Sequence, residues 1–340
     1  MRSSVRAAAA TGLVSAGLLP DPGACRFPPG QASVLRNTIS TSVEALTILG
    51  GDFALAGGEY RFTGTTNTEL NVSKFGGSGD VGDPRGLGDV DIGWQPRLQG
   101  NTGFVDATSD IRSGPQKGGA SRFKSFGIEF GMGARFWLSD SLSLAPTFTG
   151  MYGHTSNEYV PGGTSPQTNL TQASRMGLVG WSESTWTARP ALNVQYLVNR
   201  VRTVITLSSD ATFFHTGSFS SSNSKDFVNG DSASLVNKID VDIPLGWHLC
   251  GHELRTGGYF SRTDLFGDVT VGLDTEHLYE AHGRVVLDFL NQLWKVQWMG
   301  VGGSYLRGAN FRGWTAGADV QFRPERRPRR RAPRDEWCQG

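Results

Sequence analysis

Strict alternation of apolar and polar residues over 125–153 is the feature of this sequence that most constrains its fold. In "SFGIEFGMGARFWLSDSLSLAPTFTGMYG", apolar side chains occupy every second position on both sides of a polar turn at Ser139 and Asp140. Successive side chains of a strand point to opposite faces of a sheet, so this period of two predicts two β-strands joined by a tight turn. The apolar face must then contact either a protein core or lipid.

The same alternation recurs along the chain. It is clear in "TARPALNVQYLV", "VRTVITLSSDATFF", "KIDVDIPLGW", "YEAHGRVVLDF" and "GWTAGADVQF". Less regular segments near 52–62, 67–75, 88–108, 253–266 and 294–305 bring the total to about twelve strands. The sequence therefore predicts an all-β fold.

The predicted connections alternate in length. They are tight near 138–141, 198–200, 248–252 and 290–293, and longer near 109–122, 155–180 and 215–235. Short turns at one end and long loops at the other are typical of an up-and-down membrane barrel. Aromatic residues flank the short turns and are expected to form a girdle at one membrane interface: Phe136, Trp137, Tyr196, Trp247, Phe289 and Trp294.

Strand length and charge placement favour a membrane barrel over a soluble β-sandwich or lipocalin-like barrel. Many segments reach ten or more residues, whereas soluble strands have about five or six and membrane strands need about 9–11. A charge facing lipid at mid-bilayer would cost roughly 2–4 kcal/mol, and the alternation keeps charges on the other face. We therefore expect a closed antiparallel transmembrane β-barrel of about 12 strands, with its apolar face in lipid.

Outside the strands, composition divides the chain further. Arg2 and Arg6 precede a small apolar stretch typical of an export signal, whose cleavage position stays open. Helical spacing of apolar residues before the first strand suggests a short helix, and a linker or an additional strand fits the same stretch equally well. The predicted segments are a signal peptide over 1–32, a linker or lumen helix over 33–50, the barrel over 51–322, and a basic disordered tail over 323–340.

Charged residues on the polar face of the strands form the candidate functional site, because that face lines the lumen of a membrane barrel. These residues are Glu129, Arg135, Arg189, Arg202, Asp210, Asp240, Asp242, Glu280, Arg284, Asp288 and Asp319. Paired across strands, they would either fill a small lumen with salt bridges or line a selective channel.

Other motifs carry weaker hypotheses. His248, Cys250 and His252 in "HLCGHE" would share one face of a strand as metal ligands, but a polar turn explains them equally well. Ser232 in "NGDSAS" resembles an esterase serine, yet no βα pattern surrounds it. The glycine-rich stretch 76–89 lacks the strand-to-helix context of a phosphate loop. We predict no catalytic residue, no metal and no cofactor.

The strand count, the stretch 125–153, "WTARPALNVQYLVNRVRTVITL" and the Phe-ended "GWTAGADVQF" together resemble the solitary outer-membrane autotransporter β-barrel family. The resemblance covers roughly residues 50 to 322. It implies a bacterial outer-membrane location, outer-membrane lipid and the barrel-assembly machinery as partners, and Phe322 as the terminal aromatic that this machinery reads. The arginine-rich segment after Phe322 departs from the family pattern.

The resemblance implies a barrel without a passenger domain that acts as a membrane anchor, passive pore or translocator-like barrel. We expect a monomer that is not an enzyme. The formal net charge of +1 does not indicate nucleic-acid binding, and we expect no nucleic-acid partner. The alternatives are an outer-membrane hydrolase, either an esterase or a protease, and a soluble lipocalin-like ligand-binding barrel.

Overall fold

The computed structural model describes residues 54–62, 68–82, 85–87, 90–113, 116–161, 180–200, 203–222, 229–273, 275–289 and 296–322. Twelve of its strands form one closed antiparallel barrel, as predicted. They are β1 (Leu55–Phe62), β2 (Thr68–Asp80), β4 (Val90–Ser113), β5 (Gln116–Trp137), β6 (Leu142–Pro161), β7 (Ser182–Arg200), β8 (Thr203–Ser221), β9 (Asn229–Leu249), β10 (His252–Gly267), β11 (His277–Asp288), β12 (Val296–Arg307) and β13 (Phe311–Phe322).

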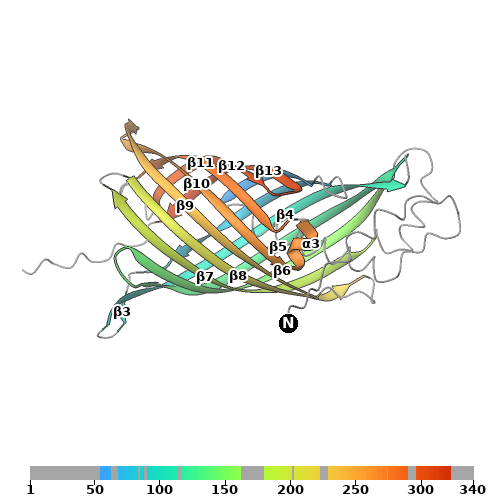
Figure 1. Cartoon of the computed structure of the whole chain (residues 1–340), viewed down its shortest axis with the longest axis horizontal. Helices are drawn as coiled ribbons and strands as arrows, with labels where there is room; N and C mark the ends of the chain where they lie inside the picture. Colours follow the sequence, from blue (N-terminus) through green and yellow to red (C-terminus); the bar gives the residue numbers. More distant parts are fainter. Residues whose placement is uncertain are drawn as a thin grey trace, which may run out of the picture.

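Each barrel strand pairs with the next one along the chain, and β1 closes the ring by pairing with β13. The strands cross the long axis of the barrel obliquely (Figure 1). The short strand β3 (Arg85–Leu87) pairs with β4 and lies outside the barrel wall, at the lower left of Figure 1. One helical turn, α3 (Asp268–Leu273), connects β10 to β11. Within the described residues, no helix is long and apolar enough to cross a membrane.

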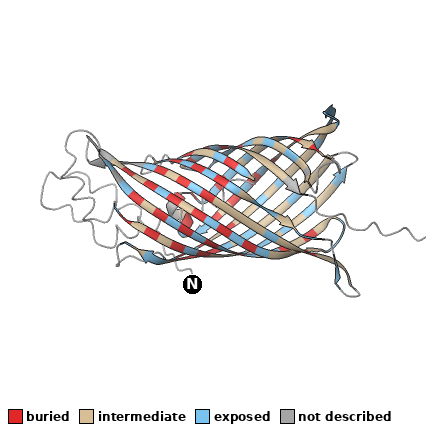
Figure 2. Cartoon of the chain, turned by 180° about the vertical axis from the view of Figure 1, so that it is seen from behind, coloured by how far each residue is buried: buried red, intermediate tan, exposed pale blue. Residues whose placement is uncertain are grey.

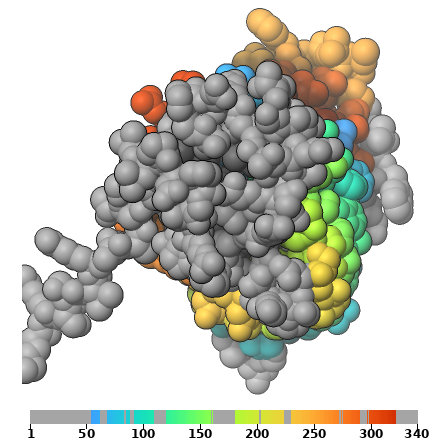
Figure 3. All heavy atoms as spheres, turned by 90° about the vertical axis from the view of Figure 1, so that its right-hand side faces the viewer, coloured from blue at the N-terminus to red at the C-terminus, as the bar shows by residue number. Residues whose placement is uncertain are grey.

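The two ends of the barrel differ in their connections. At one end, which we call the turn end, β1 begins, β13 ends, and the connections at 138–141, 201–202 and 250–251 are tight. At the other, the loop end, the chain passes through 162–181 and α3. Figure 3 views the molecule from the loop end, where the green to yellow strands β5 to β8 form the right-hand rim.

Several strands are longer than the sequence pattern predicted. The expected long loop at 109–122 is wrong, because β4 and β5 continue through it and only residues 114–115 separate them. The expected loop at 215–235 is likewise shorter, since β8 ends at Ser221 and β9 begins at Asn229. These extensions all lie at the loop end.

The outer wall of the barrel is apolar. Ile128, Phe130 and Met132 on β5 are 51%, 60% and 60% exposed, although they are large hydrophobic residues. Exposed and buried positions alternate along parts of several strands in Figure 2, as a period of two requires. The apolar face of the 125–153 stretch therefore points away from the barrel interior, which answers the question that its alternation raises.

This outer apolar surface has the height of a membrane-spanning strand. On β5 it runs from Phe126 to Phe136, and on β4 it runs from Trp94 to Phe104, 11 residues in each case by their numbering. A tilted strand needs about 9–11 residues to cross a bilayer. We call this surface the apolar band. Aromatic residues mark its limit toward the loop end: Phe104, Phe126, Tyr152, Trp186, Phe213, Phe260, Tyr279, Tyr305 and Trp314.

Beyond these aromatics the outer wall becomes charged. On most strands the outward position two residues further toward the loop end is polar or ionised. The resulting charged collar comprises Glu59, Arg61, Glu69, Asp106, Arg122, Lys124, Glu158, His215, Asp231, Arg262, Asp264, His277, Arg307 and Arg312. Several of its members form ion pairs, such as Lys124 with Glu158 at 3.1 Å. Hydrogen bonds from Arg122 are the main cause that lowers the pKa of Asp106, which lies beyond the apolar band.

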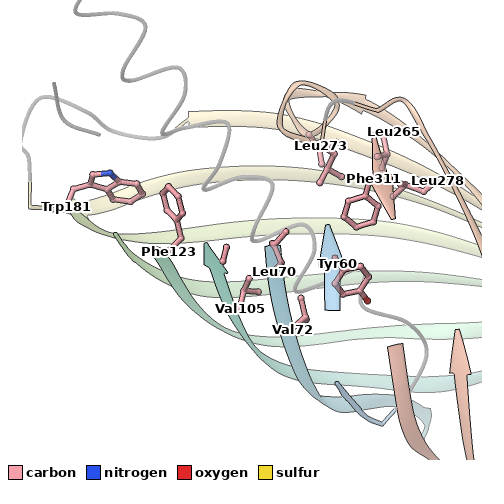
Figure 4. Packing of buried hydrophobic residues seen from close by; sticks show 12 residues of the cluster. Tyr60, Leu70, Val72, Val105, Phe123, Trp181, Leu265, Leu273, Leu278 and Phe311 are labelled. Carbon is pink, nitrogen blue, oxygen red and sulfur yellow. The ribbon is translucent and has the colours of Figure 1, made fainter. Parts of the chain in front are cut away.

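The barrel interior changes character at the same level as the outer wall. On β5, Phe123 is buried inside and Lys124 lies outside, whereas Phe126 lies outside and Glu129 is buried inside. Toward the loop end, buried apolar residues form a cluster: Tyr60, Leu70, Val72, Val105, Ala107, Phe123, Trp181, Leu265, Val269, Leu273, Leu278 and Phe311. Figure 4 shows members of this apolar cluster on neighbouring strands, with Leu273 contributed by α3. Along a single strand, apolar side chains therefore face outward in the membrane-spanning part and inward toward the loop end.

The seam between the first and last strands is packed by one aromatic side chain. Tyr60 is the register partner of Gly313. Its ring stacks on Phe311 with centroids 5.5 Å apart, and its hydroxyl forms a hydrogen bond with Thr315. A Cβ atom at Gly313 would clash with the Tyr60 ring. Gly313 therefore leaves the space that this ring fills.

We expect Gly313→Ala to lower the free energy of unfolding by about 1–3 kcal/mol, because the new methyl group forces the Tyr60 ring out of its packed position. Gly283→Ala is the matched control, since a Cβ at Gly283 meets nothing within 4 Å. Urea unfolding of the refolded barrel in detergent micelles measures both. Equal stability of the two variants would contradict the role assigned to Tyr60.

Candidate functional site in the barrel lumen

At mid-barrel, the inward face carries a charged pair that spans three strands. Glu129 on β5 forms an ion pair with Arg189 on β7, across the intervening strand β6. Gln99 on β4 donates a hydrogen bond of 2.7 Å from Nε2 to Oε1 of Glu129. The Glu129 side chain is almost fully buried. The carboxylate is thus compensated by a cation and an amide, and two of the predicted lumen residues lie together.

A second group lies near the turn end, around Asp80. The Asp80 carboxylate forms an ion pair with Arg135, whose Nε lies 2.9 Å away, and accepts a hydrogen bond of 3.0 Å from Arg97 Nη1. Arg135 also donates from Nη1 to Gln195 Oε1 at 2.6 Å and to Ser143 Oγ at 3.1 Å. Two arginines share one carboxylate here, so this part of the lumen wall has an excess of positive charge.

A third group occupies the opposite strands. Arg284 on β11 donates two parallel hydrogen bonds to Asp240 on β9, from Nη2 at 2.7 Å and from Nη1 at 2.8 Å. This fork geometry is the strong form of an arginine–carboxylate pair. Arg255 on β10 pairs with Asp242 at 3.1 Å and approaches Asp288 at 3.9 Å. Three predicted residues, Asp240, Asp242 and Arg284, therefore take part in two cross-strand pairs, and Asp288 lies beside the second pair.

The remaining predicted residues are more dispersed. Asp210 accepts hydrogen bonds from Thr212 Oγ1 at 2.7 Å and from Asn193 Nδ2 at 3.4 Å. Glu280 accepts a hydrogen bond of 2.9 Å from the Tyr259 hydroxyl. Asp319 accepts a hydrogen bond of 2.8 Å from the backbone N–H of Val320. Arg202 lies outside the described residues.

Several lumen residues were missed by the sequence analysis. Asp80, Arg97 and Arg255 belong to segments whose alternation is irregular, so their inward direction could not be assigned. A register shift between Leu254 and Arg255 explains the irregularity on β10. Trp137 was expected in the outer aromatic girdle, but it shares the inward parity of Arg135, whose guanidinium lies 5.5 Å from the indole centroid. That expectation is wrong.

The motifs considered for metal binding or catalysis have structural explanations. "HLCGHE" forms the β9–β10 turn, where Cys250 and Gly251 adopt φ values of 53° and 81°, as a two-residue hairpin turn requires. Ser232 is buried in β9, and its Oγ accepts a hydrogen bond of 3.0 Å from the backbone N–H of Val269 in α3. No group of three or more potential metal ligands occurs in the part of the chain that the structure describes.

One serine–histidine contact lies on the outer wall rather than in the lumen. His154 Nδ1 is 3.0 Å from Ser184 Oγ. A hydrolytic triad also needs a carboxylate at the second imidazole nitrogen to orient the base. The histidine–carboxylate contacts of the outer wall involve other histidines, since Asp231 contacts His215 and Asp264 contacts His277, each at 2.7 Å. These residues do not form a triad.

A closed barrel with an apolar outer band, a polar lumen and aromatic residues at the band limit defines an outer-membrane β-barrel protein. The family described as the solitary outer membrane autotransporter beta-barrel domain matches residues 85–316. The chain belongs to this family, and the barrel resides in the bacterial outer membrane. Both conclusions confirm the sequence analysis. The loop end is accordingly the extracellular end.

Solved structures of autotransporter barrels are similar to this chain. The transport unit of AIDA-I from Escherichia coli is 11% identical and has a TM-score of 0.56, covering 88% of this chain and 100% of that one. The β domain of BrkA from Bordetella is 12% identical with a TM-score of 0.49, covering 79% and 96%. The translocator domain of NalP from Neisseria meningitidis is 11% identical with a TM-score of 0.45, covering 87% and 98%.

At these identities the similarity shows the fold alone. A search of the curated proteins finds no match. Autotransporter translocator barrels are generally not enzymes.

Proposed function

We propose that this protein is a non-enzymatic membrane anchor with a narrow, passive pore of translocator type. The observation that carries the proposal is the pairing of inward charges across the lumen wall, at Glu129–Arg189, Asp240–Arg284 and Asp242–Arg255. These pairs stabilise the wall and carry no net charge themselves, so they do not attract one kind of ion. The similarity to the AIDA-I transport unit supports the translocator type at the level of the fold.

We further propose that residues 33–50, which lie outside the described residues, occupy the lumen. The apolar cluster supports this, because apolar side chains facing a water-filled channel would be unfavourable by roughly 25 cal/mol per Å² of wetted surface. An amphipathic segment with Leu35, Ile39 and Val43 on one face would cover them. The lumen of twelve strands is also wider than that of eight, which side chains alone fill.

Planar-bilayer recording tests this arrangement. The refolded full chain is expected to show low single-channel conductance, and a variant without residues 1–50 is expected to conduct several-fold more, because the segment no longer blocks the lumen. Deletion of the tail 323–340 is the control and should leave conductance unchanged. A full chain that already conducts as well as the deletion variant would contradict the proposal that residues 33–50 occupy the lumen.

The rival function is an outer-membrane hydrolase, for which Ser232 and the Ser184–His154 contact are the candidate groups. Esterase and peptidase assays on the refolded barrel should show no activity that depends on either serine. Activity that disappears in Ser184→Ala, Ser232→Ala or His252→Ala would refute the non-enzymatic proposal. The assay is independent of conductance, so the two parts of the proposal are tested separately.

We propose the partners that this function requires. Outer-membrane lipid contacts the apolar band, and the barrel-assembly machinery reads Phe322, the last residue of β13. Because the barrel closes on itself and leaves no free strand edge, we propose that it acts as a monomer. No nucleic-acid partner is proposed.

A further inference from the structure

Two arginines face each other on the outer wall at the extracellular end. Arg307 on β12 and Arg312 on β13 are register partners, and both are exposed. Their inward neighbours Leu306 and Phe311 pack into or against the apolar cluster, so the two arginines point outward. Next to them, Arg61 on β1 is the register partner of Arg312. Three arginines thus lie side by side on three adjacent strands.

This group differs from the rest of the charged collar in having no compensating carboxylate for two of its members. Arg61 is neutralised by Glu59 at 2.9 Å and approaches Glu69 at 3.5 Å. Among the described residues, no acidic side chain forms an ion pair with Arg307 or Arg312. Elsewhere in the collar, cations and anions alternate, as in the pair of Arg122 with Asp106.

An uncompensated pair of like charges destabilises a sheet when the residues are directly opposite. The adjoining connections offer no relief by sequence, because 63–67 reads Thr-Gly-Thr-Thr-Asn and 308–310 reads Gly-Ala-Asn. The counter-charge for Arg307 and Arg312 must therefore come from outside the barrel wall. Two adjacent arginines fit an anion with several oxygens, since guanidinium groups match phosphate in a bidentate fashion.

The depth of the pair in the membrane identifies the source of that anion. Tyr305 and Trp314, which are also register partners, lie two residues closer to the turn end, at the limit of the apolar band. Two residues along a strand tilted by about 40° correspond to roughly 5 Å along the membrane normal. Aromatic residues of the girdle sit at the level of the lipid headgroups. The guanidinium groups of Arg307 and Arg312 consequently lie at the level of the headgroup phosphates of the outer leaflet.

We propose that Arg307 and Arg312 form a binding site for the phosphate of an outer-leaflet glycolipid, with Tyr305 and Trp314 contacting its sugar or upper acyl region. Binding removes the repulsion between the two guanidinium groups and fixes the β12–β13 hairpin at a defined depth. Arg61 contributes less, because Glu59 and Glu69 already neutralise it. The site is separate from the lumen, and it does not depend on whether the pore conducts.

The test uses the refolded full chain in detergent, titrated with diphosphoryl lipid A and measured by native mass spectrometry. Arg307→Gln and Arg312→Gln are each expected to weaken lipid binding about tenfold, as the loss of a charge-assisted hydrogen bond predicts. The matched control is Arg122→Gln, which removes a collar arginine that already has a carboxylate partner and should bind lipid A like the wild type. Dephosphorylated lipid A and inorganic phosphate are the comparison ligands.

Thermal unfolding gives a second readout that a merely structural arginine would not produce. Without lipid, Arg307→Gln should melt at the same temperature as the wild type or higher, because it relieves repulsion. With diphosphoryl lipid A, the wild type and Arg122→Gln should gain equal stability, and Arg307→Gln and Arg312→Gln should gain clearly less. The proposal is overturned if both single variants bind lipid A like the wild type, if Arg122→Gln loses as much affinity, or if inorganic phosphate binds as tightly as lipid A.

Discussion

Replacing Phe130 with arginine is expected to lower the free energy of unfolding of the membrane-inserted barrel by about 2–4 kcal/mol, or to prevent insertion. Phe130 is 60% exposed and lies near the middle of the apolar band, between Phe126 and Phe136 on β5. A guanidinium at this depth loses its hydration without gaining a partner. Unfolding in urea from lipid vesicles, together with heat-modifiable migration, measures the effect.

Thr108→Arg is the matched control for this experiment. Thr108 also points outward, but it lies above the apolar band, where its register partner on β2 is Glu69. A surface substitution of this kind usually changes stability by no more than about 0.5 kcal/mol. If both variants lose the same stability, the outer wall at Phe130 does not contact lipid, and the apolar band is misplaced.

Arg284→Gln is expected to lower the free energy of unfolding by about 3 kcal/mol, because it leaves the Asp240 carboxylate without its counter-ion in a largely buried position. The side chains of Arg284 and Asp240 are each 16% exposed, so solvent screens the pair only in part. The same variant should shift ion selectivity toward cations, since the Asp240 carboxylate then acts on the lumen unopposed, while Asp242 keeps its partner Arg255. Reversal potentials across a salt gradient measure the shift.

A double-mutant cycle separates the pair from the individual residues. The double variant Asp240→Asn, Arg284→Gln should recover part of the lost stability, because no unpaired charge remains. Arg262→Gln is the comparison, because the Arg262 side chain is 47% exposed and solvent screens its pair with Asp264 more strongly. A double variant that is less stable than the wild type by the sum of the two single effects would show that the two residues are not coupled.

The sequence predicted the membrane-spanning part of the fold well, because one rule governs it. Along β5, outward Ile128 and inward Glu129 follow the alternation that a wall between lipid and a polar lumen requires. The rule fails above the aromatic limit, where water surrounds the barrel and the apolar cluster fills the inside. There Phe123 faces inward and Lys124 outward. A prediction that places apolar residues on the outer face along the whole strand therefore ends the strand too early and assigns a loop instead.

The contacts within the lumen could be predicted less well than the residues that line it. The alternation of apolar and polar residues indicated that Glu129 and Arg189 face inward. Whether they form an ion pair depends on the stagger of β5, β6 and β7 around the closed barrel. Likewise, the register shift at Arg255 brings this residue to Asp242 without any signal in the local alternation. Such partners follow from barrel closure, which couples residues that are distant in sequence.

The inverted parity of the wall also determines how the protein behaves once it is extracted from the membrane. A detergent belt can cover only the apolar band, which ends at residues such as Phe104 and Phe126. Residues Asp106–Ser113 of β4 and their partners on β5 continue beyond it for roughly 20 Å, given about 3.3 Å per residue and the strand tilt. This extension of the wall on β4 and β5 stays outside the micelle. It offers a rigid surface for crystal contacts or antibody fragments that most short-looped barrels lack.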